Sequence, residues 1–456
     1  MKTEAYAPED TVTILTAADP GWDEARQAWN LAVDQQPAAI ARPASAPDVV
    51  AAVGFARRHG LRVAAQGTGH NAAPLGPLSG TLLVKTSGLR QVSVDPEQMT
   101  ARAEAGVLWQ EVTGAAAGHG LAALAGSSPD VGVVGYTLGG GASWLGRKYG
   151  LAANNVEAFE AVTADGRLVR ASAHHETDLF WALRGGGGSF AVVTAVELRL
   201  FPVAEVCAGL LWWPVEAAPE VLRAWQELTS SGLPDEFTTT ARLMRFPAVP
   251  EVPEPARGRA CAVIDVIHLG SQAEADEIVA PLRALRPETD SIGIIPAREL
   301  GPLHLEPNGP VAAAADGFTL ESLPAAAVDE LIRLAGPGAE TPLAVVELRQ
   351  IGGEMGRARP GNGALAALDA GYLLGFGGGL TGPESAAAVA RGIYEVKAAM
   401  ARWAARHDYL NFAETSRVPA SFWNPESYAR LRQIKAAADP EDRIRSNHPI
   451  PPAIPY

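Results

Sequence analysis

The sequence predicts an α+β protein built from more than one domain. Its 456 residues exceed the usual length of one domain, and 47% of them are hydrophobic, which is enough to bury a large core. Over the first 200 residues, short segments of strand character alternate with helical segments. From about residue 203, Pro-rich pieces and longer helices alternate with strands, and we therefore predict a second α+β domain over residues 205–405.

One helix start is marked clearly by its first residues. Ser45 precedes Pro47 in the first turn, and Asp48 places a negative charge where the helix dipole favours it. Apolar residues follow at helical spacing, and Gly60 marks the end of this helix. Further helices are predicted over residues 108–120, 177–188 and 425–438, the second with Thr177 as its cap.

Strands are predicted from alternating or continuous apolar residues between turn signals. The segment 157–172 alternates on both sides of Asp165-Gly166, a dipeptide typical of a tight hairpin turn. The Pro-rich tail after residue 447 is expected to fold back onto the first domain. The other predicted strands are residues 61–66, 81–86, 91–95, 100–106, 191–201, 261–269, 342–351 and 408–413.

Charge and composition exclude several classes of protein. Lys and Arg number 37 and Asp and Glu 51, so the net charge of −14 disfavours a nucleic-acid partner. No apolar run is long enough to cross a bilayer, and the first residues lack the pattern of a signal peptide, so a cytoplasmic protein is expected. Cys207 and Cys261 are expected to be buried reduced thiols, and the histidine spacings predict no metal site.

Two glycine-rich segments are the strongest candidates for ligand binding. QGTGHNA, residues 66–72, directly follows a predicted strand, and the second segment spans residues 126–155. Glycine lets a backbone approach a ligand closely, and successive N–H groups can bind an anion without any lysine. The sequence has no P-loop motif. Tight turns in a compact sheet are the alternative explanation for such clusters, but His70 lies inside the first segment, where a ligand would approach.

Several longer motifs follow one another in a specific order. They are RHGLRVAAQGTGHN, VGVVGYTLGGGASWLGRKYGLAANNV, TDLFWALRGGGGSFAVVTAVEL and the C-terminal pieces YLNF and DPEDRIRSNHPIPP. Together they resemble the berberine-bridge-enzyme-like family of FAD-linked oxidases, which has the vanillyl-alcohol-oxidase type of flavoprotein fold. The resemblance implies a PCMH-type FAD-binding domain of two subdomains, residues 1–204 and 406–456. It also implies an inserted substrate domain, residues 205–405, with an antiparallel sheet covered by helices.

The resemblance implies that FAD is bonded to His70 through its 8α-methyl group. In members with two links, a Cys in the motif GxCPxVG bonds to flavin C6, but Ser128 stands at that position here. A single link is therefore expected, as in members that oxidise amines such as hydroxynicotine. The further cofactor-binding residues that the resemblance implies are Gln66, Gly67, Thr68, Gly69, Asn71, Ser127, Ser128, Val131, Gly132, Gly135, Leu138, Gly139, Gly140, Gly141, Trp144, Asn154, Asn155, Val156, Val193, Asn411 and Asn447.

Two residues are candidates for the catalytic base. Tyr409 matches a tyrosine that some members of the family place over the flavin, and a phenolate there could remove a substrate proton. A hydrogen-bonded tyrosine in a strand is the alternative interpretation. Glu347 lies on the predicted strand 342–351, one face of which should line the substrate cavity. Arg349 and Gln350 on the same strand are predicted substrate contacts.

These observations predict an FAD-dependent oxidase. It would transfer hydride from an alcohol or amine carbon of a small organic molecule, such as a secondary metabolite, to FAD, and O2 would reoxidise the flavin to give H2O2. A flavin-scaffold cyclase or isomerase of a natural-product pathway, without net oxidation, is the main alternative. A binding module that has lost its flavin is the third. We expect no membrane partner, and either a monomer or a homodimer.

Overall fold

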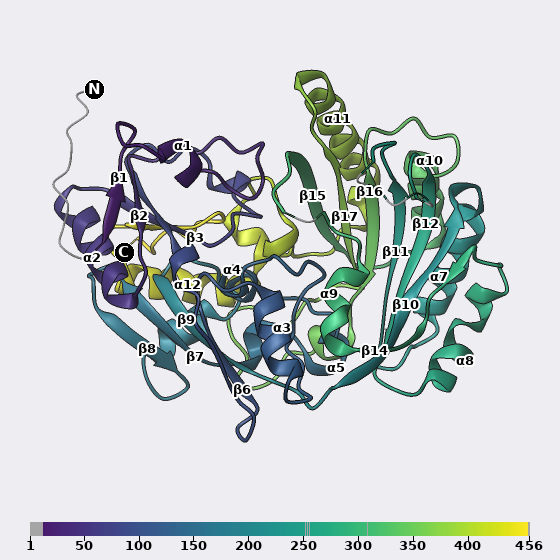
Figure 1. The fold of residues 1–456 in the computed structure, drawn as a ribbon, viewed down its shortest axis with the longest axis horizontal. Helices are drawn as coiled ribbons and strands as arrows, with labels where there is room; N and C mark the ends of the chain where they lie inside the picture. The colour runs from purple at the N-terminus through teal and green to yellow at the C-terminus, as the bar shows by residue number, and fades with distance from the viewer. Residues whose placement is uncertain (1–11, 251, 253, 255, 308, 455–456) are drawn as a thin grey trace.

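Three β-sheets and their surrounding helices form the computed structural model, which describes residues 12–250, 252, 254, 256–307 and 309–454. Two five-stranded sheets lie in the half that holds the first 200 residues and the C-terminal segment, and an eight-stranded sheet forms the other half (Figure 1). The chain enters the large sheet near residue 205 and leaves this half after α11 (Pro383–Met400). The fold is therefore α+β, as predicted.

The first sheet brings the C-terminal segment back to the N-terminal part of the chain. Its last strand pairs in parallel with β3, so that Ile444 lies beside Val63, and in the tail that follows the Ile450 N–H donates to the Ser189 hydroxyl at 3.1 Å. The helix predicted after Ser45 is α2 (Ala46–Arg58), and the Ser45 side chain accepts a hydrogen bond from the Asp48 N–H at 3.3 Å. Across the sheet, the strands are β1 (Thr13–Leu15), β2 (Ala39–Arg42), β4 (Thr81–Lys85), β3 (Arg62–Gln66) and β18 (Ile444–Arg445).

The second sheet is antiparallel and contains the predicted hairpin. Its turn includes Asp165 and Gly166, and Gly166 adopts φ +90°, a conformation that glycine reaches without strain. Across the sheet, the strands are β5 (Val92–Asp95), β6 (Thr100–Glu104), β9 (Ala191–Arg199), β7 (Val156–Thr163) and β8 (Leu168–Ser172).

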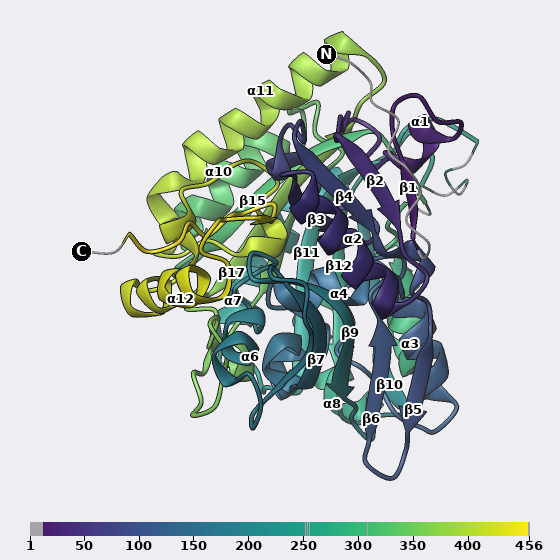
Figure 2. The ribbon, with the colours of Figure 1, turned by 90° about the vertical axis from the view of Figure 1, so that its left-hand side faces the viewer.

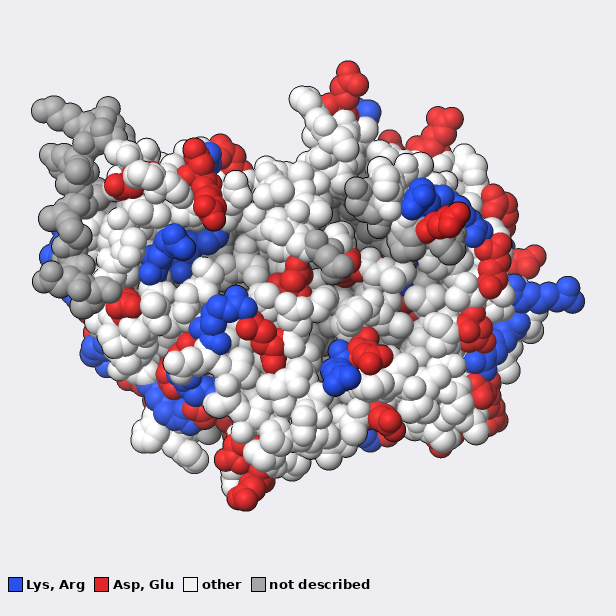
Figure 3. All heavy atoms as spheres, viewed as in Figure 1, with Lys and Arg blue, Asp and Glu red and all other residues white. Residues whose placement is uncertain are grey.

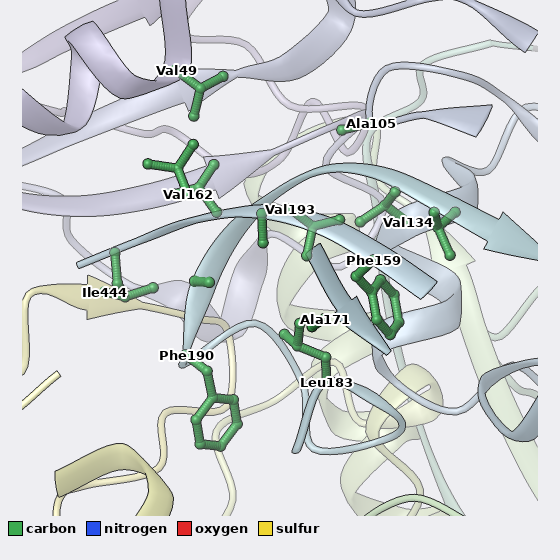
Figure 4. Close-up of a cluster of buried hydrophobic side chains, with 14 of the residues drawn as sticks. Val49, Ala105, Val134, Phe159, Val162, Ala171, Leu183, Phe190, Val193 and Ile444 are labelled. Atoms are coloured by element: carbon green, nitrogen blue, oxygen red, sulfur yellow. The ribbon is translucent and has the colours of Figure 1, made fainter. Parts of the chain in front are cut away.

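A continuous apolar core joins these two sheets. Helix α2 contacts β3 and β4 on one side and β7 and β9 on the other (Figure 2). Val49 of α2, Val162 of β7 and Val193 of β9 belong to this core (Figure 4), and each is at most 3% exposed. Burying such a side chain stabilises the fold by about 1.5–3 kcal/mol. The core therefore gives a rigid base to the loops that leave β3 and precede β7.

The eight-stranded sheet is antiparallel throughout, and its long helices lie on one face. Helices α7 (Ala218–Ser230), α8 (Gln272–Arg283), α10 (Ala325–Ala335) and α11 bury that face in a second apolar core (Figure 1). The other face is turned toward the glycine-rich loops. The strands are β13 (Thr289–Asp290), β10 (Glu205–Pro214), β12 (Ala260–His268), β11 (Phe237–Arg245), β16 (Val345–Gln350), β17 (Tyr372–Gly379) and β15 (Ala313–Leu320), with β14 (Gly293–Pro296) beside β10.

Two local predictions were wrong. Glu176, with φ +47° and no side-chain cap, precedes α6 (Thr177–Leu183), so Thr177 is the first helical residue and not the cap. Residues 408–413 do not form a strand, because Leu410–Phe412 is a turn of 3-10 helix. The remaining helices are α1 (Trp22–Ala25), α3 (Trp109–Ala117), α4 (Val133–Leu138), α5 (Gly146–Tyr149), α9 (Leu300–Leu303) and α12 (Pro425–Ala438).

The surface carries both signs of charge. On the face shown in Figure 3, Lys and Arg are interspersed with Asp and Glu. Among the helices that the structure describes, none combines the length and the apolar character needed to span a bilayer. Cys207 and Cys261 are buried and free, as predicted.

Candidate functional site

A cavity of about 1550 Å³ lies between the glycine-rich loops and the face of the large sheet opposite to its long helices. Cavities of about 300–1,000 Å³ enclose ligands of ordinary size, so this one has room for a dinucleotide and a small substrate together. Its walls come from the loop after β3, residues 126–139, strands β10, β11, β15, β16 and β17, and residues 409–414 and 445–447. The N-terminal part of the chain, its C-terminal segment and the large sheet therefore all contribute to the cavity wall.

The loop after β3 offers unused backbone donors to this cavity. Within the described residues, the N–H groups of Thr68, Gly69, His70 and Asn71 donate no hydrogen bond. Gly69 adopts φ +90°, and a Cβ there would lie 2.9 Å from the Ala28 Cβ. Only glycine therefore fits at position 69 without movement of its neighbours. The free N–H groups of the loop suit a polar or anionic ligand that approaches the backbone.

The second glycine-rich segment meets the C-terminal segment at close range. A Cβ on Gly139 would lie 1.7 Å from the Asn411 Oδ1, so no larger residue fits there without movement. The Asn411 side chain donates hydrogen bonds to the Tyr136 carbonyl at 2.9 Å and to the Tyr409 hydroxyl at 3.0 Å. These contacts fix the position of the 3-10 turn against the loop.

His70 lies in a pocket of specific contacts on the cavity wall. Its ring stacks on Trp29 with centroids 3.9 Å apart, and its Nε2 lies 3.2 Å from the Asp130 Oδ1. That contact is not aligned as a hydrogen bond, which leaves a buried Nε2 without a satisfied partner. Asp130 itself accepts hydrogen bonds from the Trp29 Nε1 at 2.6 Å and the Ser128 hydroxyl at 2.8 Å.

The electrostatic state of Asp130 follows from these contacts. Burial alone would raise the pKa of its carboxyl group, but the contacts with His70, Trp29 and Ser128 lower the pKa to about 2. Asp130 is therefore an anion across the physiological pH range.

A network of buried charges covers the floor of the cavity on the large sheet. The His304 ring contacts the Asp265 Oδ2 through Nδ1 at 3.0 Å and the Glu347 Oε2 through Nε2 at 2.9 Å. Arg242 donates to Asp265 and, at 2.6 Å, to the His304 carbonyl. Arg349 donates to the Glu347 Oε1 at 3.0 Å. Asp265 is fully buried, so its charge depends on Arg242 and His304 for compensation.

Arg349 connects this floor to the second glycine-rich segment. Its Nη2 donates to the Ser127 hydroxyl at 3.0 Å, and its guanidinium lies over the rings of Phe412 and Trp144. Burial alone would raise the pKa of Glu347, but the Arg349 charge and the His304 contact hold it well below its ordinary value. Glu347 is therefore ionised at neutral pH and faces the cavity.

Tyr409 is buried against the second glycine-rich segment. Its hydroxyl oxygen accepts a hydrogen bond from the Ala142 N–H at 2.8 Å in addition to the one from Asn411. Burial raises the pKa of Tyr409 to about 12, despite these donors. The alternative that Tyr409 is a hydrogen-bonded side chain agrees with these contacts, although the residue does not lie in a strand.

One predicted substrate contact is wrong. Glu347 and Arg349 share the cavity face of β16, whereas Gln350 points to the helix-covered face and donates to the Thr229 carbonyl of α7 at 3.2 Å. Side chains alternate along a strand, so neighbouring residues 349 and 350 cannot both line the cavity.

Six of the predicted cofactor-binding residues do not line the cavity, and they contact protein groups behind its wall. Asn154 donates to the Leu365 carbonyl at 3.1 Å, and Asn155 donates to the Tyr149 carbonyl at 2.9 Å. Val156 belongs to the apolar core, and Trp144 packs edge-on against His304. A Cβ on Gly140 would meet Leu365, and one on Gly141 would meet Tyr136 and Ala152.

The other predicted positions reach the cavity. They are His70, Gln66, Gly67, Thr68, Gly69, Asn71, Ser127, Ser128, Val131, Gly132, Gly135, Leu138, Gly139, Val193, Asn411 and Asn447, with Tyr409, Glu347 and Arg349.

Sequence reasoning missed four polar groups of the site. Arg242, Asp265 and His304 belong to the charge network, and nothing in the sequence brings them together. Asp265 inside the apolar strand CAVIDVIHL was the one available signal, because a lone carboxylate in a buried strand needs a partner. Glu414, which lines the cavity, is the fourth. Burial, together with the charges of Asp316 and Glu306, raises its pKa to about 7.

The residues on the cavity wall fit FAD. A cavity of this volume, a backbone cradle limited to glycine and free N–H groups match a dinucleotide with its pyrophosphate, and the His70 ring reaches the same cavity. Within the described residues, no group of three or more His, Cys, Asp or Glu side chains is arranged to hold a metal ion.

Comparison with known proteins gives the same result. Residues 37–172 match the FAD binding domain family. The chain is 30% identical to (R)-6-hydroxynicotine oxidase of Paenarthrobacter nicotinovorans, over 96% of each chain. The crystal structure of 6-hydroxy-D-nicotine oxidase from Arthrobacter nicotinovorans superimposes with a TM-score of 0.83 at 27% identity, covering 99% of this chain and 100% of that one. BBE-like 1 of Physcomitrella patens has the same fold, with a TM-score of 0.84 at 21% identity over 97% and 98% of the two chains.

Fold, cavity and sequence likeness together define an FAD-linked oxidoreductase. The chain belongs to the berberine-bridge-enzyme-like family of FAD-linked oxidases with the PCMH-type FAD-binding fold.

Proposed function

We propose that this protein is an oxidase with FAD bonded covalently to His70. It transfers hydride from an alcohol or amine carbon of a small organic substrate to the flavin, and O2 takes the electrons to give H2O2. The observation that carries the proposal is the position of His70, stacked on Trp29 at the cavity wall beside four free backbone N–H groups.

A single covalent link is part of this proposal. Ser128 lies on the cavity wall where relatives with two links have Cys, and a hydroxyl cannot replace a thiolate in that bond. Cys207 and Cys261 are buried in the large-sheet half and do not line the cavity.

Different residues of the chain bind the cofactor and the substrate. FAD supplies the two-electron acceptor when it is bound. The N–H groups of residues 68–71 would bind its polar part, and the part of the cavity over strands β11 and β16 of the large sheet would receive the substrate. Arg349 bridges the two sides through Ser127 and places a positive charge between cofactor loop and substrate floor.

Both candidate bases are hydrogen-bonded within the protein. Glu347 is ionised at neutral pH and faces the cavity, so it can accept a hydrogen bond from a substrate O–H or N–H group. Arg349 and His304 contact its two oxygens and lower its pKa, which makes Glu347 a weak proton acceptor. Tyr409 keeps its proton below a pH of about 12, and its oxygen already accepts two N–H groups. Tyr409 therefore acts as a hydrogen-bond donor that positions the substrate.

An experiment on the purified protein tests this proposal. Acid precipitation should give a yellow pellet, and His70→Ala should give a colourless one. A panel of alcohols and amines, including 6-hydroxynicotine because of the relative named above, is then added without oxygen. Bleaching of the flavin and H2O2 release on reoxygenation support an oxidase. Substrate loss with the flavin still oxidised and no peroxide would instead support a cyclase or isomerase.

A further inference from the structure

We infer that Asp130 directs formation of the covalent bond between His70 and FAD, by holding the imidazole so that Nδ1 carries the reactive lone pair. This inference rests on the proposed link at His70. It assigns a positioning role to a residue that neither the family resemblance nor the cavity lining singles out.

The geometry around His70 leaves one ring nitrogen available. Trp29 covers a face of the ring, and Nε2 is buried 3.2 Å from the Asp130 Oδ1. Nδ1 has no recorded partner within the described residues, and the ring lies on the cavity wall. A ligand in the cavity can therefore reach His70 through Nδ1, while Nε2 stays against the carboxylate.

The charge of Asp130 selects the tautomer. The negative charge 3.2 Å from Nε2 favours the tautomer that carries its proton on Nε2, so Nδ1 keeps its lone pair. When Nδ1 forms a bond to carbon, positive charge develops on the ring, and an anion 3.2 Å away stabilises it. A carboxylate behind a catalytic histidine in a serine protease has the same two effects.

The partners of Asp130 keep its carboxylate in place. The Trp29 indole donates to one oxygen at 2.6 Å, and the Ser128 hydroxyl donates to the other at 2.8 Å. Trp29 therefore both stacks on the histidine and orients the carboxylate that faces it. Ser128 occupies the position of the second flavin link in two-link relatives, and here its hydroxyl orients Asp130 instead.

The bond formation balances with O2 as the oxidant. One C–H bond of the 8α-methyl breaks and its proton leaves, and the Nδ1 lone pair forms the new C–N bond. The two electrons released pass through the flavin to O2. The imidazole loses its Nε2 proton, and the two protons and two electrons convert O2 to H2O2.

The test measures link formation and needs no substrate. The full chain is produced under riboflavin limitation, mixed with FAD in air, and sampled for flavin that stays with the acid-precipitated protein. Asp130→Asn has nearly the same shape but can donate to Nε2, so it favours the wrong tautomer. We expect the rate constant for linkage to fall by at least about 100-fold, because an Asp to Asn change behind a catalytic histidine costs about 10⁴-fold. The Kd for FAD before linkage should change by less than about threefold.

Further variants separate positioning from folding. Ser128→Ala removes one donor to Asp130 but keeps the carboxylate, and the linkage rate should fall by about 2–10-fold, since a lost hydrogen bond costs about 0.5–1.5 kcal/mol. In Asp130→Ala, added formate should restore part of the rate. Asp178→Asn, an exposed carboxylate paired with Arg430, is the matched control and should link at the wild-type rate.

The outcomes distinguish this inference from the proposed function. If wild-type protein holds no acid-stable flavin, or if His70→Ala still does, the link at His70 is wrong and the inference fails with it. If the wild type links through His70 and Asp130→Asn binds FAD and links at the wild-type rate, only the role of Asp130 is overturned. If Asp130→Asn loses FAD affinity and linkage together, and formate restores neither in Asp130→Ala, Asp130 is structural and the inference is also overturned.

Discussion

Removing the negative charge of Asp265 should destabilise the large-sheet half severely. Asp265 and Arg242 are 0% and 1% exposed, and Arg242 has no other anion among its recorded partners. Asp265→Asn therefore leaves a buried guanidinium uncompensated, which costs about 3–5 kcal/mol. For a unit of about 200 residues, 1 kcal/mol shifts the melting temperature by about 2–4 °C, so the expected decrease is about 6–20 °C.

Thermal unfolding of the FAD-loaded protein measures this decrease. Asp329→Asn is the matched control, because Asp329 pairs with Arg223 at the surface with both side chains about half exposed, and such pairs contribute about 0–1 kcal/mol. The double variant Arg242→Met with Asp265→Asn should be less destabilised than the sum of the single variants, since neither charge is then left alone. A decrease for Asp265→Asn no larger than that of the control would refute the argument that these charges depend on each other.

Three further changes test other parts of the account. Glu347→Gln should slow anaerobic flavin bleaching by about 10–150-fold, because a hydrogen bond to a charged acceptor contributes about 1.5–3 kcal/mol. It should also lower the melting temperature, because Arg349 loses its paired carboxylate. Unchanged bleaching would remove Glu347 from substrate binding. Gly139→Ala should displace Asn411 and lower the amount of acid-stable flavin that the protein acquires per chain, because the new Cβ would lie 1.7 Å from the Asn411 Oδ1, whereas Gly114→Ala in α3, with open space around it, should acquire as much flavin as the wild type. Glu414 has a folded-state pKa raised to about 7, so it favours protonation in the folded protein, and stability is lost as pH rises from about 4.5 to about 7. Glu414→Gln should therefore raise the melting temperature at pH 8 and leave it unchanged at pH 4, and equal effects at both values would contradict the assigned pKa.

Local sequence signals predicted the parts of the fold that depend on local chemistry. The cap at Ser45, the hairpin at Asp165-Gly166 and the loop that holds His70 were all visible in short segments. Gln350 shows the limit of the same reasoning, because a displacement of one residue along β16 moves a side chain from the cavity to the core beneath α7. The helix at Thr177 was also predicted, but not the left-handed Glu176 that precedes it.

The charge network could not be predicted, because it depends on contacts between distant segments. His304 lies between two leucines just after α9, and its neighbours in sequence give no indication that Asp265 and Glu347 will flank its ring. The resemblance singled out Tyr409 as a candidate base. Its hydrogen bonds, however, come from Ala142 and Asn411 and depend on the 3-10 turn that replaces the predicted strand. Asp130 was likewise visible in the sequence, and only the fold places it beside His70.

The most direct test of the account is mass spectrometry of the intact protein and of its peptides after acid denaturation. The account predicts one FAD per chain, carried by the peptide that contains His70, with no flavin on the peptide that contains Ser128. Protein without added flavin mass, or with FAD attached to any other residue, would contradict it.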